Sequence, residues 1–324
     1  MKKRLLEIVD RYRGKTVCII GDIMLDHFMF GSIEKISPEA PVPVVSVHQE
    51  SFRPGGAGRT ASITASLGGK VILIGVVGDD PFAQQLLHEL RIRHIDIGNI
   101  LVNKRIKTTQ KIRVLSRDQH VVRIDRDNEE IVDKGTEAKI IQMVRHYIEG
   151  VGCFIVSDYA KGLVTRKLAK SLLNLAQEYK KPIVVDTKPE HISYFQHATL
   201  LTPNYKEAKE FTKLEDLEKM GSNIQERLHC NVLITKDSEG MILFHDNSIA
   251  YFPAKARTVS HTAGAGDAVV ATLALSLASN SSLKEATAIA NTVAAIVIEK
   301  TPMARITINE VRKRILMEKD EKYK

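Results

Sequence analysis

A short run of small residues ends in a carboxylate in the last quarter of the chain. The run is Gly264, Ala265, Gly266 and Asp267, and residues 268–274 after it favour a helix. Small residues let a ligand approach the backbone closely, and free amides at a helix N-terminus suit an anion such as a phosphate. The carboxylate could cap the helix, or it could remove a proton from a hydroxyl that attacks a phosphoryl group. The spacing alone leaves both interpretations open.

Two common nucleotide-binding motifs have partial matches that fail on their context. Residues 14–16 resemble the end of a P-loop, but position 9 is Val and the segment precedes a predicted strand instead of following it. Residues 56–61 resemble a weak dinucleotide fingerprint, but residues 50–54 before them do not have the pattern of a buried strand. We therefore reject both motifs.

Short apolar runs rich in β-branched residues alternate with helical patterns along the chain. The runs predict buried strands at 16–20, 71–77, 153–156, 183–185, 199–201 and 232–235, and helices are predicted at 81–90, 164–180 and 205–212. This alternation predicts an α/β fold with a mostly parallel sheet covered on both faces. Ligands of such sheets bind beyond the carboxyl ends of the strands. The residues placed there are Asp22, Gly78, Asp158, Asp186, Asn204 and Lys236.

Two segments interrupt the alternation. Residues 28–52 contain three prolines among alternating valines, and residues 106–126 form two extended pieces with several basic side chains. Both predict strands of a small accessory sheet, or lid. We expect one domain over 1–324 with lid segments at about 23–53 and 100–127. The charged tail at 311–324 predicts a solvated helix.

The bulk composition is that of a soluble globular protein. Hydrophobic residues make up 44% and charged residues 27% of the chain, and no apolar run approaches the ~18 residues of a membrane span. We recognise no secretory signal at the N-terminus. Cys18, Cys153 and Cys230 are odd in number and far apart, which favours reduced thiols in the cytoplasm over disulfides or a zinc site.

The net charge of +8 could favour nucleic acid, small anionic ligands or solubility alone. Nucleic-acid binding predicts basic clusters interleaved with aromatic residues. Lys and Arg are scattered here, Trp is absent and aromatic residues make up 5% of the chain. We therefore expect no nucleic acid as a partner, and the other two interpretations stay open.

Three motifs together resemble the PfkB/ribokinase family of carbohydrate kinases. Residues 54–57 and 264–267 are similar to its two glycine-rich signatures, and residues 204–207 to its Asn-x-x-Glu motif. The resemblance covers nearly the whole chain. It implies a three-layer α/β/α ribokinase-like fold with a β lid, and the use of ATP with Mg²⁺.

Longer segments narrow this resemblance to the D-glycero-β-D-manno-heptose-7-phosphate kinases. They are residues 21–26, 36–45, 113–119, 157–162 and 201–204. The implied reaction phosphorylates the anomeric hydroxyl to give the 1,7-bisphosphate, in ADP-heptose synthesis for lipopolysaccharide. Since 324 residues leave no room for a fused adenylyltransferase domain, we expect a stand-alone kinase.

The resemblance also implies roles for the nucleotide side of the site. Asp267 would be the base, and the amides at 264–266 would form an anion hole. Asn204 and Glu207 would organise Mg²⁺ through water, with no direct protein ligand to the metal assigned. The remaining residues expected near the nucleotide are Lys236 and Asn291, although routine helix packing is an equal alternative for Asn291.

On the substrate side, Asp26 and the Gly55-Gly56 turn would hold sugar hydroxyls. The phosphate of the substrate needs cations, and Lys111, Arg113 and Lys161 are candidates by charge and position, with a solvated surface charge as the alternative for each. The complete predicted set for the substrate is Asp26, Gly55, Gly56, Arg59, Lys111, Arg113, Asp158 and Lys161.

Two residues depart from the family pattern. Arg59 stands where the family usually has an Asn that touches sugar, and it could block the sugar or bind an anionic substrate. His261 replaces an Asp that helps to bind a monovalent cation. Because potassium favours hard oxygen ligands, we do not expect activation by potassium.

Two alternatives to the heptose kinase remain. One is a kinase of this family for another sugar or sugar phosphate, and the other is a catalytically weak sugar-phosphate-binding regulatory protein on the same fold. We expect a homodimer joined through the lids, because a lid sheet with one apolar face needs cover.

Overall fold

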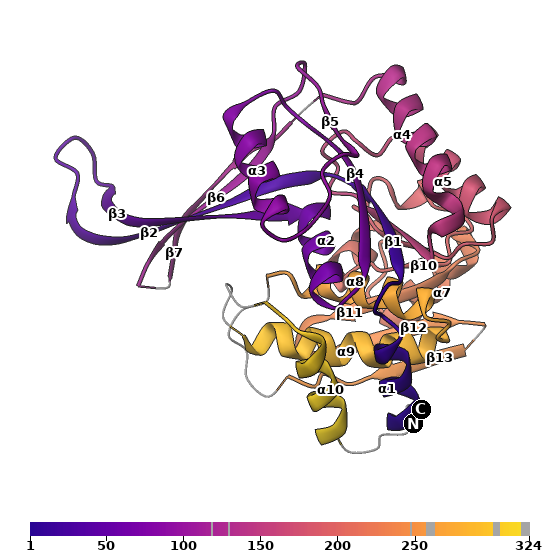
Figure 1. The fold of residues 1–324 in the computed structure, drawn as a ribbon. Coiled ribbons are helices and arrows are strands. Elements are labelled where there is room, and N and C mark those ends of the chain that lie inside the picture. The colour runs from indigo at the N-terminus through magenta and orange to yellow at the C-terminus, as the bar shows by residue number, and fades with distance from the viewer. Residues whose placement is uncertain (118, 129, 247, 257–262, 301–304, 319–324) are drawn as a thin grey trace.

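A large twisted sheet forms the centre of the molecule (Figure 1). The computed structural model describes residues 1–117, 119–128, 130–246, 248–256, 263–300 and 305–318. Within these residues the strand order is β13-β12-β11-β10-β9-β8-β1-β4-β5. The strands are β1 Thr16–Gly21, β4 Lys70–Val77, β5 Ile100–Val102, β8 Cys153–Ser157, β9 Ile183–Asp186, β10 Leu200–Leu201, β11 Asn231–Lys236, β12 Gly240–His245 and β13 Ser248–Phe252.

The strands from β11 across to β5 run parallel, as the sequence predicts, and all six predicted buried strands are present. Alternate side chains of β1 enter different cores, because successive residues of a strand face opposite sides of a sheet. Val17 and Ile19 join one core, whereas Cys18 and Ile20 join the other. Strands β12 and β13 extend the sheet as antiparallel neighbours.

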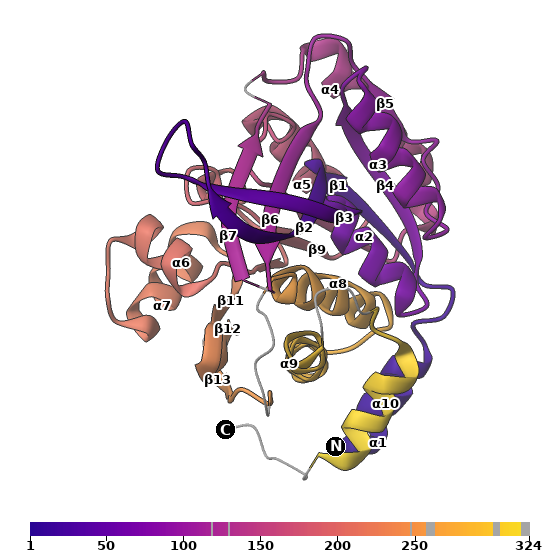
Figure 2. The same cartoon turned by 90° about the vertical axis from the view of Figure 1, so that its left-hand side faces the viewer.

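Helices cover both faces of this sheet, which gives the predicted three-layer α/β/α arrangement (Figures 1 and 2). The helices that share a core on one face are α1 Lys2–Asp10, α2 Ala57–Ser66, α3 Pro81–Arg91, α8 Ala265–Ala278, α9 Leu283–Glu299 and α10 Ile308–Met317. Those on the other face are α4 Lys134–Tyr147, α5 Arg166–Glu178, α6 Tyr205–Thr212 and α7 Leu217–Leu228. Short 3₁₀ turns lie at Ile148–Gly150, Ile192–Tyr194 and Asp237–Glu239.

A smaller sheet projects from this body (Figure 1). Its order is β3-β2-β6-β7, with β2 Ile23–Ile36, β3 Pro43–Gly56, β6 Thr109–Ser116 and β7 Gln119–Arg126. Strands β2 and β3 form a long hairpin, and β6 pairs in parallel with β2 and antiparallel with β7. Pro38 and Pro41 lie in the hairpin turn, where the missing N–H of proline breaks no ladder. The predicted accessory sheet is therefore confirmed.

Several predicted boundaries are wrong. Residues 100–102 form β5 beside β4 in the large sheet, so the second lid segment begins at Thr109 and not at 100. The first lid segment does begin at about 23 as predicted, since β2 starts at Ile23, but it extends to Gly56 at the end of β3 and not to 53. Helix α5 begins after Thr165, whose side chain accepts the N–H of Leu168 and caps the helix, so the predicted start at 164 is too early.

The tail is also better packed than the sequence predicts. Thr307 and Glu310 form a reciprocal capping box, which starts α10 at Ile308 and not at 311. Val311 and Ile315 are buried in the core that α10 shares with α1, and the two helices lie side by side in Figure 2. This part of the predicted solvated helix is therefore docked, and residues 319–324 lie outside the described residues.

The three cysteines are free and buried. In the described part of the chain, no helix combines the length and the apolar character that a membrane crossing needs.

Candidate active site

A cavity of about 210 Å³ lies where β9, β10 and β11 end and where α6 and α8 begin. This is the carboxyl edge of the parallel strands, where the sequence analysis expects a ligand. The residues that line it are Tyr159, Asp186, Lys188, Thr202, Asn204, Glu207, Thr235, Gly264, Gly266, Asp267, Val269 and Val270.

The start of α8 forms one wall of this cavity. Gly264 is the N-cap residue with φ 86°, a left-handed conformation that favours glycine. A Cβ at this position would meet a guanidinium nitrogen of Arg59 at 2.9 Å, whereas a Cβ at Gly266 would meet no atom within 4 Å. The first-turn amides of a helix have no partner within the helix, and they lie at its positive end. Of the predicted anion-binding residues, Gly264 and Gly266 therefore line the cavity and Ala265 does not.

Asp267 lies in the same first turn and is buried. Its Oδ1 accepts hydrogen bonds from Thr60 Oγ1 and from Tyr159 Oη, each at 3.0 Å. Burial raises the pKa of Asp267, while the charge of Arg59 and the two hydrogen bonds oppose this rise. The carboxylate thus has partners on one oxygen and a raised basicity, which are properties that suit proton transfer.

Asp26 on β2 lies between two guanidinium groups. Arg59 donates to its Oδ2, and Arg113 Nη1 on β6 donates to its Oδ1 at 2.6 Å. Burial alone would raise the pKa of Asp26, but the charges and hydrogen bonds of the two arginines lower it overall. A Cβ at Gly55 would come within 2.7 Å of Oδ2, so this glycine makes room for the carboxylate. Gly56 ends β3 at φ 56° and is the N-cap of α2.

Asn204 and Glu207 lie on the opposite side of the cavity, at the start of α6. They form a capping box, in which each side chain accepts the backbone N–H of the other residue. Lys188 Nζ also contacts Glu207 Oε1 at 2.5 Å. Asp186 is nearby, and burial together with the charges of Glu207 and Asp267 raises its pKa to about 8.

This excess of carboxylates in an oxygen-lined cavity suits Mg²⁺, which prefers oxygen ligands and keeps several waters. Among the described residues, no group of three or more His, Cys, Asp or Glu side chains is placed to hold a metal ion. On this side of the cavity, one lining carboxylate beside which a hydrated Mg²⁺ could bind is that of Glu207.

None of the eight residues predicted to bind substrate lines this cavity, and two of them, Asp158 and Lys161, have other partners. Asp158 is fully paired, because it accepts from the amide of Ala160, from Thr187 Oγ1 and from the ring of His191. Lys161 Nζ forms an ion pair with Asp127 at 2.6 Å. The structure thus places both in the network that supports the loop after β8, and it does not bring them to Asp267.

Two residues predicted near the nucleotide also have protein partners. Lys236, at the end of β11, pairs with Glu239 at 2.9 Å and lies 5.4 Å from the ring centre of Tyr205. Asn291 is buried on α9, and its Nδ2 donates to the carbonyl of Pro253 at 2.7 Å. Neither side chain lines the cavity. The contact of Asn291 with Pro253 agrees with packing, and a role at the nucleotide stays a prediction.

Three residues of the site have no role in the sequence analysis, namely Thr60, Tyr159 and Lys188. Tyr159 and Lys188 follow β8 and β9 by two residues, so their place at the carboxyl edge of the sheet was a usable signal. The sequence holds no such signal for Thr60, because Thr60 reaches Asp267 only through the packing of α2 against α8.

Lys111 was predicted, and its ammonium lies 5.4 Å from the ring centre of Tyr159. His261 lies outside the described residues, so the expectation about potassium stays a prediction.

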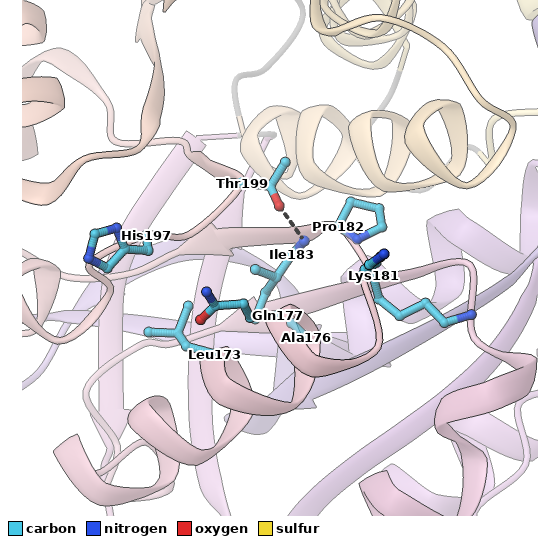
Figure 3. Close-up of a pocket in the computed structure, with 9 residues that line it drawn as sticks. Leu173, Ala176, Gln177, Lys181, Pro182, Ile183, His197 and Thr199 are labelled. Carbon is cyan, nitrogen blue, oxygen red and sulfur yellow. Dashed lines mark hydrogen bonds between the residues drawn. The ribbon is translucent and has the colours of Figure 1, made fainter.

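A second, more open pocket of about 450 Å³ lies at the amino ends of β9 and β10 (Figure 3). Its wall includes Lys181, His197 and Ile183, whose amide donates to Thr199 Oγ1 at 3.0 Å. Asp267 lies near the carboxyl ends of the strands, at the opposite edge of the sheet. No predicted site residue lines this second pocket.

Curated proteins with similar sequences have a common name. The chain is 34% identical over 303 residues to the bifunctional protein HldE of Helicobacter pylori strain J99, and 36% identical over 301 residues to that of Campylobacter curvus. These alignments cover 92% and 91% of this chain, but only 65% and 64% of the relatives. The chain thus spans slightly less than two thirds of their length.

Solved structures of two kinases share the fold. Phosphofructokinase-2 from Escherichia coli in complex with potassium aligns with a TM-score of 0.78 and 19% identity, over 94% of this chain and 98% of that one. Ribokinase from Thermotoga maritima aligns with a TM-score of 0.71 and 17% identity, over 93% and 99% of the two chains. These likenesses confirm the predicted ribokinase-like α/β fold.

The family itself is identified by a match over most of the chain. Residues 15–306 match the pfkB family carbohydrate kinase, a range that includes the small sheet, the cavity and Asp267. The prediction of a carbohydrate kinase is confirmed at this level. The chain belongs to the pfkB family of carbohydrate kinases.

Proposed function

We propose that this protein transfers the γ-phosphoryl group of ATP to the anomeric hydroxyl of D-glycero-β-D-manno-heptose 7-phosphate, giving ADP and the 1,7-bisphosphate. The observation that supports it most is the buried carboxylate of Asp267 in the first turn of α8, with Arg59 close by. In this proposal a proton acceptor, an anion-binding helix terminus and a cation share one site. The choice of heptose rests on the sequence motifs and on the relatives named HldE.

In this mechanism Asp267 takes the proton of the anomeric hydroxyl. The hydroxyl oxygen forms a bond to the γ-phosphorus as the bond to the β,γ-bridging oxygen breaks, and ADP leaves with that electron pair. The amides of Ala265 and Gly266 stabilise the negative charge on the transferred group. Because the helix terminus is already formed, these dipoles need no rearrangement during the reaction.

The phosphate of the substrate is assigned to the cations around Asp26. Arg59 and Arg113 pair with this one carboxylate, which leaves one positive charge in excess before Lys111 is counted. The two guanidinium groups are largely buried, and a desolvated cation attracts an anion more strongly than an exposed one does. A guanidinium can also bind two phosphate oxygens at once.

Nucleotide and metal are assigned to the other side of the cavity. Glu207 and Asn204 would hold a hydrated Mg²⁺, which would supply positive charge that offsets the charge of the ATP phosphates. Lys188, which contacts Glu207, is the cation among the described lining residues that lies on this side. The reaction belongs to ADP-heptose synthesis in this assignment, and buried free thiols are in keeping with the cytoplasm.

A second candidate is a kinase of another sugar or sugar phosphate, which Arg59 favours. Its guanidinium is held against Asp26 and lies close to Gly264, so it fills part of the space that a neutral sugar would need.

A homodimer joined through the small sheet is supported by the exposed apolar side chains of that sheet, for which burial against a second copy would be favourable. Examples are Ile36, Val47 and Val122, which are 60%, 44% and 46% exposed.

The test is a substrate screen with purified protein, Mg²⁺ and ATP, run with and without potassium. ADP release gives the rate for heptose 7-phosphate, for other sugar phosphates and for the same sugars without phosphate, and ³¹P spectra locate the new phosphate. We expect the highest kcat/KM for heptose 7-phosphate, with the new phosphate on the anomeric carbon. A preference for an unphosphorylated sugar would reject the heptose-phosphate assignment, and sugar-phosphate binding without turnover would favour the regulatory protein.

A further inference from the structure

The two oxygens of the Asp267 carboxylate have different surroundings. Oδ1 accepts both the hydroxyl of Thr60 and the hydroxyl of Tyr159. Among the described residues, no hydrogen bond to Oδ2 is found. One oxygen is therefore saturated by two fixed donors, and the other is available to a ligand in the cavity that Asp267 lines.

We propose that Tyr159 is a positioning residue for the base, because its hydroxyl acts with Thr60 to hold Oδ1 of Asp267 and to leave Oδ2 for the acceptor hydroxyl. The inference rests on the proposed function in one respect, namely that Asp267 accepts the proton. Tyr159 does not touch the reacting atoms in this assignment. It acts only through the orientation and the basicity of Asp267.

The backbone of Tyr159 is fixed by a buried carboxylate at the end of β1. Asp22 accepts the amides of Tyr159, Lys161 and Leu163 at 2.8, 3.1 and 3.3 Å. These three hydrogen bonds hold residues 159–163, in the loop after β8, against the end of β1. The tyrosine thus starts from a rigid anchor, as a positioning residue requires.

The ring of Tyr159 is fixed by contacts from three other segments. The ammonium groups of Lys111 and Lys188 lie 5.4 and 5.3 Å from its centre, at distances typical of cation–π contacts. Gly56 lies so close that a Cβ there would be 3.4 Å from the ring. These contacts come from the small sheet, from the loop after β9 and from the start of α2, and together they determine where the hydroxyl points.

The hydroxyl of Tyr159 acts as a donor to Asp267. Burial, followed by the negative charge of Asp267, holds the pKa of this tyrosine well above its ordinary value, so the group stays protonated. The other charged groups that face Asp267 are Arg59 from α2, Asp26 from β2 and Asp186 from the end of β9. Loss of the Tyr159 donor leaves all of them in place.

The change Tyr159→Phe tests the inference, because it keeps the ring and its contacts and removes only the donor. Removing a donor to the charged form raises the pKa of a carboxylate, so Asp267 should titrate at higher pH. The acid limb of kcat against pH should move in the same direction. We expect kcat at neutral pH to fall roughly 10- to 100-fold, with little change in KM, since hydrogen bonds to charged groups are of this strength.

Two measurements are needed. The titration of Asp267 is followed in the free protein by the ¹³Cγ signal of labelled aspartate, assigned by its loss in Asp267→Asn, and kcat and KM are measured across pH. Tyr251→Phe is the matched control. Tyr251 lies on β13, and its hydroxyl donates a hydrogen bond to Glu218 at the surface. This variant should change neither quantity.

Several outcomes would overturn the inference. One is an unchanged midpoint for Asp267 in Tyr159→Phe, and another is a rise in KM at constant kcat, which would make Tyr159 a substrate contact. If the Phe variant does not fold, the pair Thr60→Val and Thr60→Ser tests the other donor to Oδ1 of Asp267. An equal titration midpoint of Asp267 in these two variants would contradict the inference. If the wild type phosphorylates no sugar, the proposed function fails, but the titration still decides whether Tyr159 controls Asp267.

Discussion

Arg59 donates a hydrogen bond to Asp26 from the first turn of α2. The two residues connect that helix with β2 of the small sheet, and the same guanidinium lies beside Gly264 at the start of α8. Burial would lower the pKa of Arg59, but the charges of Asp26 and Asp267 raise it overall. The residue that departs from the family pattern is therefore held by charge between the carboxylates of Asp26 and Asp267.

The change Arg59→Asn should raise KM for the sugar phosphate by roughly 10- to 100-fold, because it removes a charge-assisted contact to an anion. The kcat/KM for the unphosphorylated sugar should change little or improve, since Asn is smaller and neutral. Steady-state kinetics with the pair of substrates measures the difference.

Arg59→Lys is the matched control for this change. It keeps the charge but loses the planar fork, so its KM should lie between those of the wild type and Arg59→Asn. Thermal unfolding of each variant separates binding from stability, because Asp26 keeps Arg113 as a partner in both. Equal losses for the phosphorylated and unphosphorylated sugars would contradict a role in reading the phosphate.

Asp267→Asn should lower kcat by roughly 10²- to 10⁴-fold, the usual contribution of a general base. The amide keeps an oxygen that can accept from Thr60 and Tyr159, so the fold of the site should persist. Calorimetric titration should give an affinity for Mg²⁺-ATP close to that of the wild type. Full turnover in this variant would exclude Asp267 as the base, and a loss of ATP affinity equal to the loss of kcat would assign it to nucleotide binding.

The sequence predicts the fold well, because its signals are local. A buried parallel strand such as β1 or β8 is a continuous apolar run, and both appear where the pattern indicates. The errors arise at boundaries. Helix α10 begins earlier than its charge pattern indicates, because Thr307 caps it and Val311 packs into the core. Such tertiary contacts are not visible in composition.

The site is predicted less completely, for a physical reason. Asp267 lies in a glycine-rich run that a local pattern reveals, and Glu207 lies in a short motif shared with the family. The contact of Thr60 with Asp267 joins residues 207 positions apart, and the pairing of Arg113 with Asp26 spans 87. Their distances follow from how α2 packs on α8 and how β6 pairs with β2, and no local pattern encodes them.

Glu207→Gln should weaken the response to Mg²⁺ without unfolding α6. Gln at this position can still accept the N–H of Asn204, so the capping box persists, but the negative charge is lost. We expect kcat to fall about 10-fold or more and the half-saturating Mg²⁺ concentration to rise, because a carboxylate that holds the hydrated ion is missing.

Rates measured across Mg²⁺ concentrations at constant free ATP check this expectation. Glu210→Gln is a suitable control, because this residue lies on the same helix but does not line the cavity. An unchanged Mg²⁺ dependence in Glu207→Gln would remove Glu207 from the metal site.

Asp186→Asn should stabilise the ligand-free protein more as the pH rises. The pKa of Asp186 is raised from 3.8 to about 8 by burial and by the charges of Glu207 and Asp267, so the folded state binds its proton more tightly than the unfolded state. Such a group stabilises the fold fully below pH 3.8, and this contribution is lost as the pH rises toward 8. Asn cannot ionise and avoids the loss. The gain in unfolding free energy over wild type should be near zero at low pH and reach the order of a few kcal/mol in alkaline solution.

Urea unfolding across this pH range measures the gain. A gain that does not depend on pH would show that the neighbours of Asp186 do not raise its pKa. Saturating Mg²⁺-ATP should reduce the difference, because bound Mg²⁺ would neutralise the carboxylates that oppose ionisation of Asp186.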